Sequence, residues 1–306
     1  MNVLFEWIQE RKIEKQLLAE AGVPPQAALW RLYWRRLKRH PLALFGVAVF
    51  CFFLLMAFIG PLVAPYEFQA QDIVHRLKPP SWQHFCGTDH FGRDIFSRIL
   101  VGSRGIFLLG GAGTLLAGAV GISLGLFSGY VGGLWDEVLM RMLDIFLAFP
   151  PLLLALVVLS TIGPSLSSLI MVVAILYVPM LARVTRSMVL DLKTKEFVEA
   201  AVTRGESRWY ILFHEILPNA YAPLLVEMSM RFSYAIFLVA SLGFLGMGVQ
   251  PPSPDWGLQI NEARSYFASA PWMLLCPAFA ISLLVVATNL MTDGFRHVLD
   301  PKGVHQ

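Results

Sequence analysis

The sequence predicts an all-α integral membrane protein with six transmembrane helices, on the basis of its composition and the spacing of its apolar runs. Apolar residues make up 56% of the 306 positions and charged residues only 15%, whereas a typical soluble domain carries about 25% charged residues. Six mostly apolar runs have lengths that suit the roughly 20 residues needed to cross a bilayer. The 22 Phe and 8 Trp exclude a disordered chain, and three scattered cysteines exclude a disulfide scaffold.

The expected spans are separated by polar segments that set their direction across the membrane. The spans cover residues 42–63, 106–130, 143–159, 166–182, 221–249 and 272–291. Between them lie an outer loop at 65–103, a cytoplasmic loop at 183–219 and a second outer loop at 250–271. With both the N and C termini in the cytoplasm, 17 Lys and Arg residues fall inside and 6 outside, and Arg231 alone lies within a span. This distribution satisfies the positive-inside rule.

Residues 1–40 precede the first span and are predicted to be a cytoplasmic amphipathic segment. Phe5, Ile8, Ile13 and Leu17 alternate with Glu and Lys at roughly helical spacing, and a basic run at 35–39 stands directly before the span. We expect this helix to lie on the inner leaflet. A frayed polar tail is the alternative, because chain termini are often poorly ordered.

Small residues mark one face of the second span. Gly121, Gly125 and Gly129 recur at intervals of four, so this face lacks side chains. Neighbouring helices can approach such a face closely, and this packing is common in lipid. The pattern occurs in channels, carriers and membrane enzymes alike and does not choose among them.

The fifth span contains two charged residues that could pair. Glu227 and Arg231 stand four residues apart, on one helical face. Charges within spans are costly and point to function, so we take Glu227, Met228, Arg231 and Phe232 as candidates for lining a solute path. The alternative is a structural ion pair near the inner end of the helix, with Arg231 reaching toward water.

The first outer loop carries His84, Cys86, Asp89 and His90 within seven residues. Each is a possible metal ligand, but interleaved glycines and an arginine leave no established ligand spacing, so no metal site is expected. The chain also lacks a phosphate-binding loop that ends in Gly-Lys-Ser/Thr. If transport is driven by ATP, the nucleotide must therefore bind to another chain.

The cytoplasmic loop predicts a helix, a glycine break and a second helix. Ala200 and Ala201 give the first helix a smooth face, Gly205 permits a sharp turn, and Pro218 is placed to open the next span. A short helix of this kind suits docking into a groove on a cytosolic partner. An ordinary amphipathic connector would show the same spacing.

These residues carry a resemblance to a known family. The stretch resembles the EAA motif of ABC importer permeases at Glu199, Ala200, Ala201, Gly205, Leu217 and Pro218. The Ile position of the motif holds Glu215, a departure expected to weaken helix packing there.

Further motifs appear in the same order as in one subfamily of these permeases. They are Gly87-Thr88-Asp89 with Gly92-Arg93-Asp94 in the first outer loop, Pro251-Pro252 with Asp255-Trp256-Gly257 in the second, and Asp293-Gly294-Phe295-Arg296 with Asp300-Pro301 at the end. Together they resemble the C-type permease of the dipeptide/oligopeptide/nickel importers, over residues 35–303.

The resemblance implies a type I ABC importer permease fold over residues 41–303, in the bacterial cytoplasmic (inner) membrane. It implies a heterodimer with a homologous B-type permease, two ATP-binding subunits that hold ATP and Mg²⁺, and a periplasmic or lipoprotein solute-binding protein. Apart from membrane lipid no other partner is expected, and no nucleic acid. The coupling helix would include Glu199, Ala200, Ala201, Arg204 and Gly205.

The chain would then be a non-enzymatic permease subunit for di- or oligopeptides. Glutathione, nickel chelates and antimicrobial peptides are alternative cargoes for the same machinery. A secondary transporter driven by an ion gradient is the rival from a different class, but such folds often show internal repeats, and none is clear here.

Overall fold

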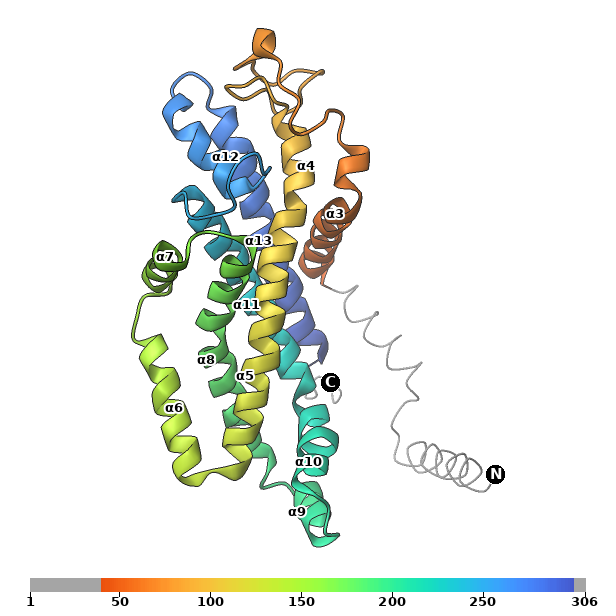
Figure 1. Cartoon of the computed structure of the whole chain (residues 1–306). Helices are drawn as coiled ribbons and strands as arrows, with labels where there is room; N and C mark the ends of the chain where they lie inside the picture. Colours follow the sequence, from red (N-terminus) through yellow and green to blue (C-terminus); the bar gives the residue numbers. More distant parts are fainter. Residues whose placement is uncertain (1–39, 300–306) are drawn as a thin grey trace, which may run out of the picture.

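The computed structural model describes residues 40–299, which form a bundle of helices joined by loops (Figure 1). The interfacial helix expected before residue 40 and the motif residues Asp300 and Pro301 lie outside the described part of the chain. The longer helices are α3 (Pro41–Val63), α4 (Ile95–Ile106), α5 (Ala112–Val131), α6 (Gly133–Leu147), α7 (Pro151–Ile162), α8 (Leu166–Leu192), α9 (Glu196–Thr203), α11 (Leu217–Phe244), α12 (Trp256–Ala263) and α13 (Trp272–Leu299). Short helical segments are η1 (Ile73–His75), η2 (Phe107–Gly111), α10 (Arg208–Tyr210), η3 (Ile211–Ile216) and η4 (Arg264–Tyr266).

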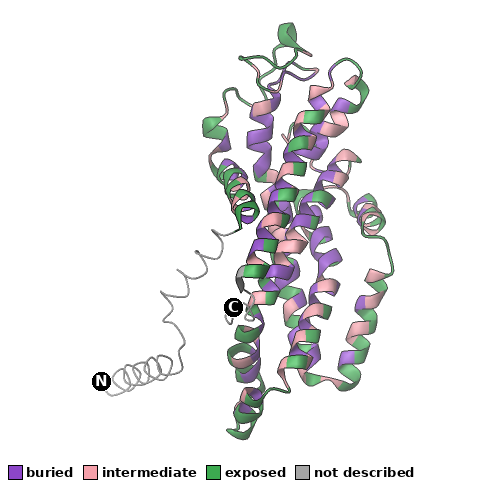
Figure 2. Ribbon diagram, turned by 180° about the vertical axis from the view of Figure 1, so that it is seen from behind, coloured by how far each residue is buried: buried purple, intermediate pink, exposed green. Residues whose placement is uncertain are grey.

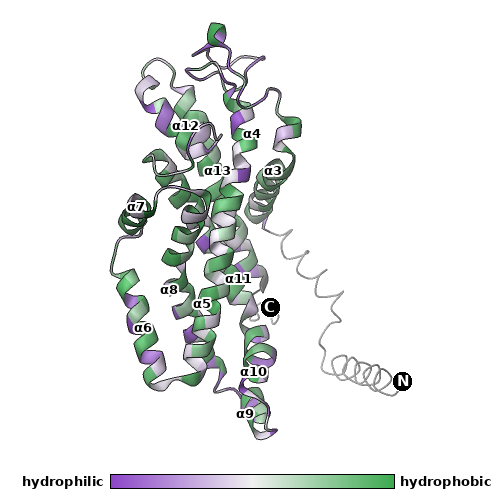
Figure 3. Cartoon of the chain, in the orientation of Figure 1, coloured by the Kyte–Doolittle hydropathy of each residue, from purple (hydrophilic) through white to green (hydrophobic). Residues whose placement is uncertain are grey.

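The membrane-spanning part agrees with the expected all-helical fold. Among the described residues, five continuous helical stretches are long and apolar enough to cross a bilayer, and the bent pair α6–α7 makes a sixth when counted as one span. Hydrophobic residues dominate the middle of these helices, while polar residues gather toward the two ends of the molecule (Figure 3).

The second span begins earlier than predicted. Helix α4, the π-helical segment η2 and α5 form one stretch of 37 residues, Ile95–Val131, so residues expected in the outer loop are helical. Asp94 caps the start by accepting a hydrogen bond from the Ser97 backbone N–H at 2.7 Å. Hydropathy alone does not predict this first turn, because Ser97 and Arg98 are polar. Both are nevertheless buried by other parts of the chain.

The third span is not the straight helix expected over residues 143–159. Helices α6 and α7 meet at a bend of 87°. Pro150 has φ −58° and ψ 127°, an extended conformation, because a residue that precedes a proline, here Pro151, is disfavoured in the helical region. The proline pair therefore ends one helix and begins another.

The fifth span also differs from the expectation, in both of its bounds. Its helical stretch runs from Arg208 to Phe244, so Pro218 lies inside a continuous helix and does not open it. The π-helical segment η3 directly precedes Pro218, and such wider turns accompany the loss of a proline N–H from the helical hydrogen-bond ladder. At the far end the helix stops before Gly246, which has φ +82°.

Helices α5 and α8 pack closely along the glycine face that the sequence predicted. A Cβ atom on Gly121 would lie 2.8 Å from the carbonyl oxygen of Val178, and Gly125 and Gly129 approach α8 just as closely. Buried residues concentrate in these central helices, and exposed ones on α3, α6 and α9 (Figure 2). The two backbones therefore touch where a side chain would keep them apart.

The polar elements divide between the two ends of the bundle. The loop that leads into α4 and the helix α12 lie at one end, and α9 and α10 lie at the other (Figure 1). We call these the outer end and the inner end, after the sides predicted from the charge distribution.

Candidate functional site: the inner helix and the outer ion network

Helix α9 at the inner end contains most of the residues predicted for partner docking. Val198 and Ala201 are buried, at 2% and 0% exposure. They belong to a small apolar cluster whose other buried members are Leu126, Val189, Ile211, Leu212 and Ile216. Glu199 and Ala200 are exposed on the other side of the helix. The two alanines therefore have different roles. Ala201 packs α9 against α5, α8 and η3, whereas Ala200 is exposed and accessible to another molecule.

Gly205 ends α9 in a left-handed turn. Its φ is +78°, and a Cβ atom added there would meet nothing within 4 Å. The Glu206 N–H donates to the Ala201 carbonyl at 3.2 Å, and the Gly205 N–H donates to the Val202 carbonyl at 2.9 Å. This pair of hydrogen bonds is the Schellman arrangement that closes helix C-termini. The glycine is needed for its backbone conformation, and the space around it remains open.

Glu215, which stands at the Ile position of the motif, faces the end of α9. Its Oε1 atom accepts a hydrogen bond from the Nη2 of Arg204 at 3.3 Å. The adjacent Ile216, at 0% exposure, makes the buried contact in this turn. The expected weakening of helix packing is therefore not what the structure shows, because the apolar contact is made one residue later and Glu215 gains an ion pair. Pro218 is exposed two residues beyond Ile216.

The charged pair in α11 forms as the spacing predicted. The Nε of Arg231 donates to the Oε1 of Glu227 at 2.8 Å, and the two side chains are 15% and 10% exposed. The guanidinium also lies 3.0 Å from the Sδ of Met180 and 5.5 Å from the centre of the Tyr234 ring. Arg231 borders a cleft of about 460 Å³, whose other lining residues are Pro151, Leu152, Tyr177, Met180, Tyr234, Phe237, Leu238 and Ser241.

The other two path candidates pack inside the bundle. A Cβ atom on Gly118 would lie 2.6 Å from the Cε of Met228, so the methionine fills the gap that this glycine leaves. The Phe232 ring lies 6.0 Å from that of Phe50 and 5.7 Å from that of Phe107. Of the four candidates, only Arg231 borders the cleft. Sequence reasoning missed Tyr234, although its position three residues after Arg231 puts it on the same side of the helix.

At the outer end, the motif residues build a buried ion network. The Oδ2 of Asp89 accepts from the Nε of Arg93 at 2.5 Å and from the Nη1 of Arg98 at 2.7 Å. Glu262, in α12 of the second outer loop, accepts from Arg93 at 2.8 Å and from Arg98 at 3.2 Å. Arg98 is 1% exposed. Glu262 was missed because nothing in its own neighbourhood in the sequence shows that it returns to the first loop.

The remaining motif residues hold the same loop in shape. Gly87 and Gly92 have φ of +72° and +78°, Thr88 forms an isolated β-bridge with Asp94, and Asp94 lies 2.9 Å from the Nδ1 of His84. Among residues 40–299, no three His, Cys, Asp or Glu side chains gather as metal ligands would. The motif therefore fastens the loop to the start of α4 and to α12.

Comparison with known proteins places this arrangement in a family. Residues 121–303 match the model of the binding-protein-dependent transport system inner membrane component, and residues 28–80 match the N-terminal TM domain of oligopeptide transport permease C. The chain belongs to this permease family. The permease is accordingly a multi-pass protein of the inner membrane, with the type I importer fold that its motifs implied.

Curated relatives of the permease align over most of its length. It is 41% identical to the dipeptide transport system permease protein DppC of Alkalihalophilus pseudofirmus, over 89% of this chain and 90% of the relative. It is 41% identical to the glutathione transport system permease protein GsiD of Pectobacterium atrosepticum, over 89% and 91%. It is 38% identical to GsiD of Escherichia coli O6:K15:H31, over 98% of both chains. All three are named as transport permeases.

Proposed function

We propose that this permease is the membrane subunit of an ATP-driven importer that brings di- and oligopeptides across the inner membrane. ATP and Mg²⁺ bind to two separate ATPase subunits, a homologous B-type permease completes the channel, and a solute-binding protein delivers the cargo. On this proposal the cofactors belong to those partner subunits. Both termini lie in the cytoplasm, in keeping with the excess of Lys and Arg on that side.

One observation carries the coupling role of α9. The helix is exposed on the Glu199 and Ala200 side, while Val198 and Ala201 pack against residues of α5, α8 and η3. An ATPase that grips the exposed side would therefore move three membrane elements through a single apolar cluster. Such a rigid-body movement fits an alternation between inward-open and outward-open states.

The cleft beside Arg231 is the candidate section of the solute path. A guanidinium among aromatic and aliphatic side chains suits a cargo with a carboxylate and apolar side chains. Glu227 holds the guanidinium in place through the 2.8 Å hydrogen bond, and Met228 and Phe232 support the wall from inside the bundle. A peptide supplies both chemical features.

Glutathione is the second candidate cargo, because two of the relatives described above are named glutathione permeases. Glutathione is itself a small peptide, so the same machinery would serve. Uptake of a labelled dipeptide and of labelled glutathione by vesicles that contain the complete importer separates the two cargoes.

Charge reversal at Glu199 tests the coupling role. In reconstituted importer, Glu199→Arg should abolish cargo-stimulated ATP hydrolysis and uptake while the subunits still insert and the chain folds. Glu67→Arg is the matched control, because it reverses an exposed acidic residue in the outer loop and should leave both rates unchanged. Normal uptake by Glu199→Arg would contradict the proposed docking.

A further inference from the structure

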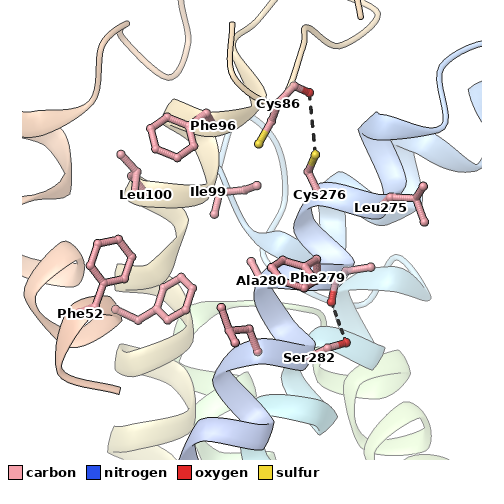
Figure 4. Close-up of a pocket in the computed structure, with 13 residues that line it drawn as sticks. Phe52, Cys86, Phe96, Ile99, Leu100, Leu275, Cys276, Phe279, Ala280 and Ser282 are labelled. Carbon is pink, nitrogen blue, oxygen red and sulfur yellow. Dashed lines mark hydrogen bonds between the residues drawn. The ribbon is translucent and has the colours of Figure 1, made fainter. Parts of the chain in front are cut away.

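Two of the three cysteines face each other across elements that are 190 residues apart. Cys86 lies in the first outer loop, just before Gly87, and Cys276 lies in the second turn of α13. The Cys276 thiol points at the Cys86 carbonyl oxygen, with the Sγ 4.0 Å from that oxygen (Figure 4). Cys51, the third cysteine, is exposed on α3.

The loop is already held along this face of α13. One helical turn before Cys276, the Nε1 of Trp272 donates to the Thr88 carbonyl at 3.3 Å. The residues at 272 and 276 therefore contact successive parts of the same short loop segment. With the Sγ of Cys276 4.0 Å from the main-chain oxygen of Cys86, the two cysteines are neighbours, as a disulfide requires.

Both thiols are partly accessible from one side. Cys86 and Cys276 are half-buried, and they border an apolar pocket of about 630 Å³ together with Phe96, Ile99 and Phe279 (Figure 4). A small reagent can therefore reach the sulfur atoms, and the surrounding side chains keep them close. The outer face of a bacterial inner membrane is an oxidising environment, in which disulfides persist.

We propose that Cys86 and Cys276 form a reversible disulfide that ties the first outer loop to α13. The assignment to an oxidising compartment rests on the proposed orientation, in which this loop is outside. The bridge needs a disulfide-bearing oxidant, either a small molecule or a thiol oxidase of the outer compartment.

The reaction balances through thiol–disulfide exchange. One cysteine, as thiolate, attacks a sulfur of the oxidant and releases one oxidant thiol. The second cysteine then attacks the mixed disulfide and releases the other. The protein loses two protons and two electrons, and the oxidant disulfide becomes two thiols. Hydrogen bonding to Cys276 and burial raise the pKa of the Cys86 thiol, so bridge formation should speed up as the pH rises.

The bridge is tested on the complete importer in lipid nanodiscs, treated with the small disulfide cystamine. After denaturation, a polyethylene glycol maleimide counts the remaining thiols of this chain. The reduced chain should carry three labels. In the oxidised chain Cys86 and Cys276 should carry none, whereas Cys51 should be either labelled or capped by cysteamine. The oxidised sample should also yield a linked peptide pair that contains Cys86 and Cys276 and disappears on reduction.

Matched variants identify the bridge. Cys51→Ala should still form it, whereas Cys86→Ser and Cys276→Ser should each block it and leave the other cysteine as a free thiol or as a mixed disulfide with cysteamine. Three labels on the oxidised wild type, or a bridge that includes Cys51, would overturn the proposal. The folded state is checked by co-purification of the partner subunits in every variant.

A second experiment tests the proposed membrane orientation independently of whether the two cysteines can form a bridge. Spheroplasts and inside-out vesicles are treated with the charged, membrane-impermeant aromatic disulfide 5,5′-dithiobis(2-nitrobenzoate). Bridging in spheroplasts supports both proposals. Bridging in nanodiscs and in inside-out vesicles, but not in spheroplasts, overturns the orientation and with it the oxidising compartment, while the geometry of the pair stands.

Discussion

The outer and inner ends of the permease are held by different forces. At the outer end, Asp89, Arg93, Arg98 and Glu262 form a network whose side chains are at most 15% exposed. At the inner end, Arg204 is 54% exposed and pairs with Glu206 and Glu215 at 3.7 Å and 3.3 Å. The outer end is fixed by charges shielded from water, and the inner helix by a small apolar cluster with exposed charges around it.

Buried and exposed ion pairs differ in how strongly they resist a change in geometry. Buried ions lose their hydration, and only complete pairing offsets that loss, so the outer network tolerates one geometry. Exposed ion pairs contribute little and re-form easily. The inner end can therefore shift against a partner at small cost, while the outer loop keeps its shape.

Breaking the outer network should have the largest effect. Arg98→Met leaves Asp89 and Glu262 buried with Arg93 as their remaining cation, and we expect a loss of about 3–5 kcal/mol in the free energy of unfolding. Denaturant unfolding of the purified complex measures it. Arg76→Met, at an exposed arginine of the same loop, is the control and should change stability little. A loss as small as that of the control would show that the network is not a stabilising unit.

The second effect is a pH dependence at the outer end. Burial raises the pKa of Asp255 from 3.8 to about 6, against hydrogen bonds from the Leu258 and Gly257 backbone. The native state thus holds the proton more tightly than the unfolded state. The protonated Asp255 therefore adds to the free energy of unfolding. This contribution is fully present below about pH 4 and is lost as the pH rises through about 6. At neutral pH the loss is on the order of 3 kcal/mol.

Melting curves of the wild type and of Asp255→Asn measure this effect. The asparagine keeps an oxygen to cap α12 but cannot titrate. We expect the Tm of the wild type, relative to that of the variant, to be higher at pH 5 than at pH 7.5. A difference that does not depend on pH, or one of opposite sign, would contradict the burial of a titrating Asp255.

Gly205 should show a smaller and local effect. Gly205→Ala forces an alanine into a left-handed conformation that costs roughly 1–2 kcal/mol, with no steric clash to add to it. The amides of α9 should then exchange about 5- to 30-fold faster, without a change at the outer end. Gly205→Asn is the matched variant, because asparagine enters this conformation more readily. Equal exchange rates in the alanine variant and the wild type would refute the need for glycine.

The smallest effect is expected at Arg204. Arg204→Ala removes the pairs with Glu206 and Glu215. Because Arg204 is 54% exposed in these pairs, α9 should lose no more than about 1 kcal/mol. Hydrogen exchange in low and high salt measures this, and the difference from the wild type should shrink as salt rises. A loss comparable to that of Arg98→Met would erase the contrast between the two ends.

The sequence predicted much of this architecture because hydropathy and charge are local signals. The six apolar runs, the glycine face of α5 and the pairing of Glu227 with Arg231 all follow from spacing along one helix. The bend at Pro150 also had a local signal, since a proline pair inside a 17-residue run should have ended the helix.

Other features depend on contacts that the sequence does not display. The helix α4 looks like a loop because Ser97, Arg98 and Arg104 are polar. The burial of Arg98 depends on Asp89 and on the distant Glu262. The separate roles of Ala200 and Ala201 depend in the same way on where α5 and η3 lie. The motif pointed to α9 as the proposed docking helix, but which side of α9 is exposed required the structure.

The unbroken helical stretch from Ile95 to Val131 also bears on how far the permease stands out from the lipid. Its 37 residues correspond to about 55 Å at 1.5 Å per residue, against a hydrocarbon layer of roughly 30 Å. Even when tilted, such a rod extends beyond the acyl chains into the headgroups and the water above them. The solute-binding protein proposed above would thus meet the loop around Asp89 without a lipid-binding surface of its own.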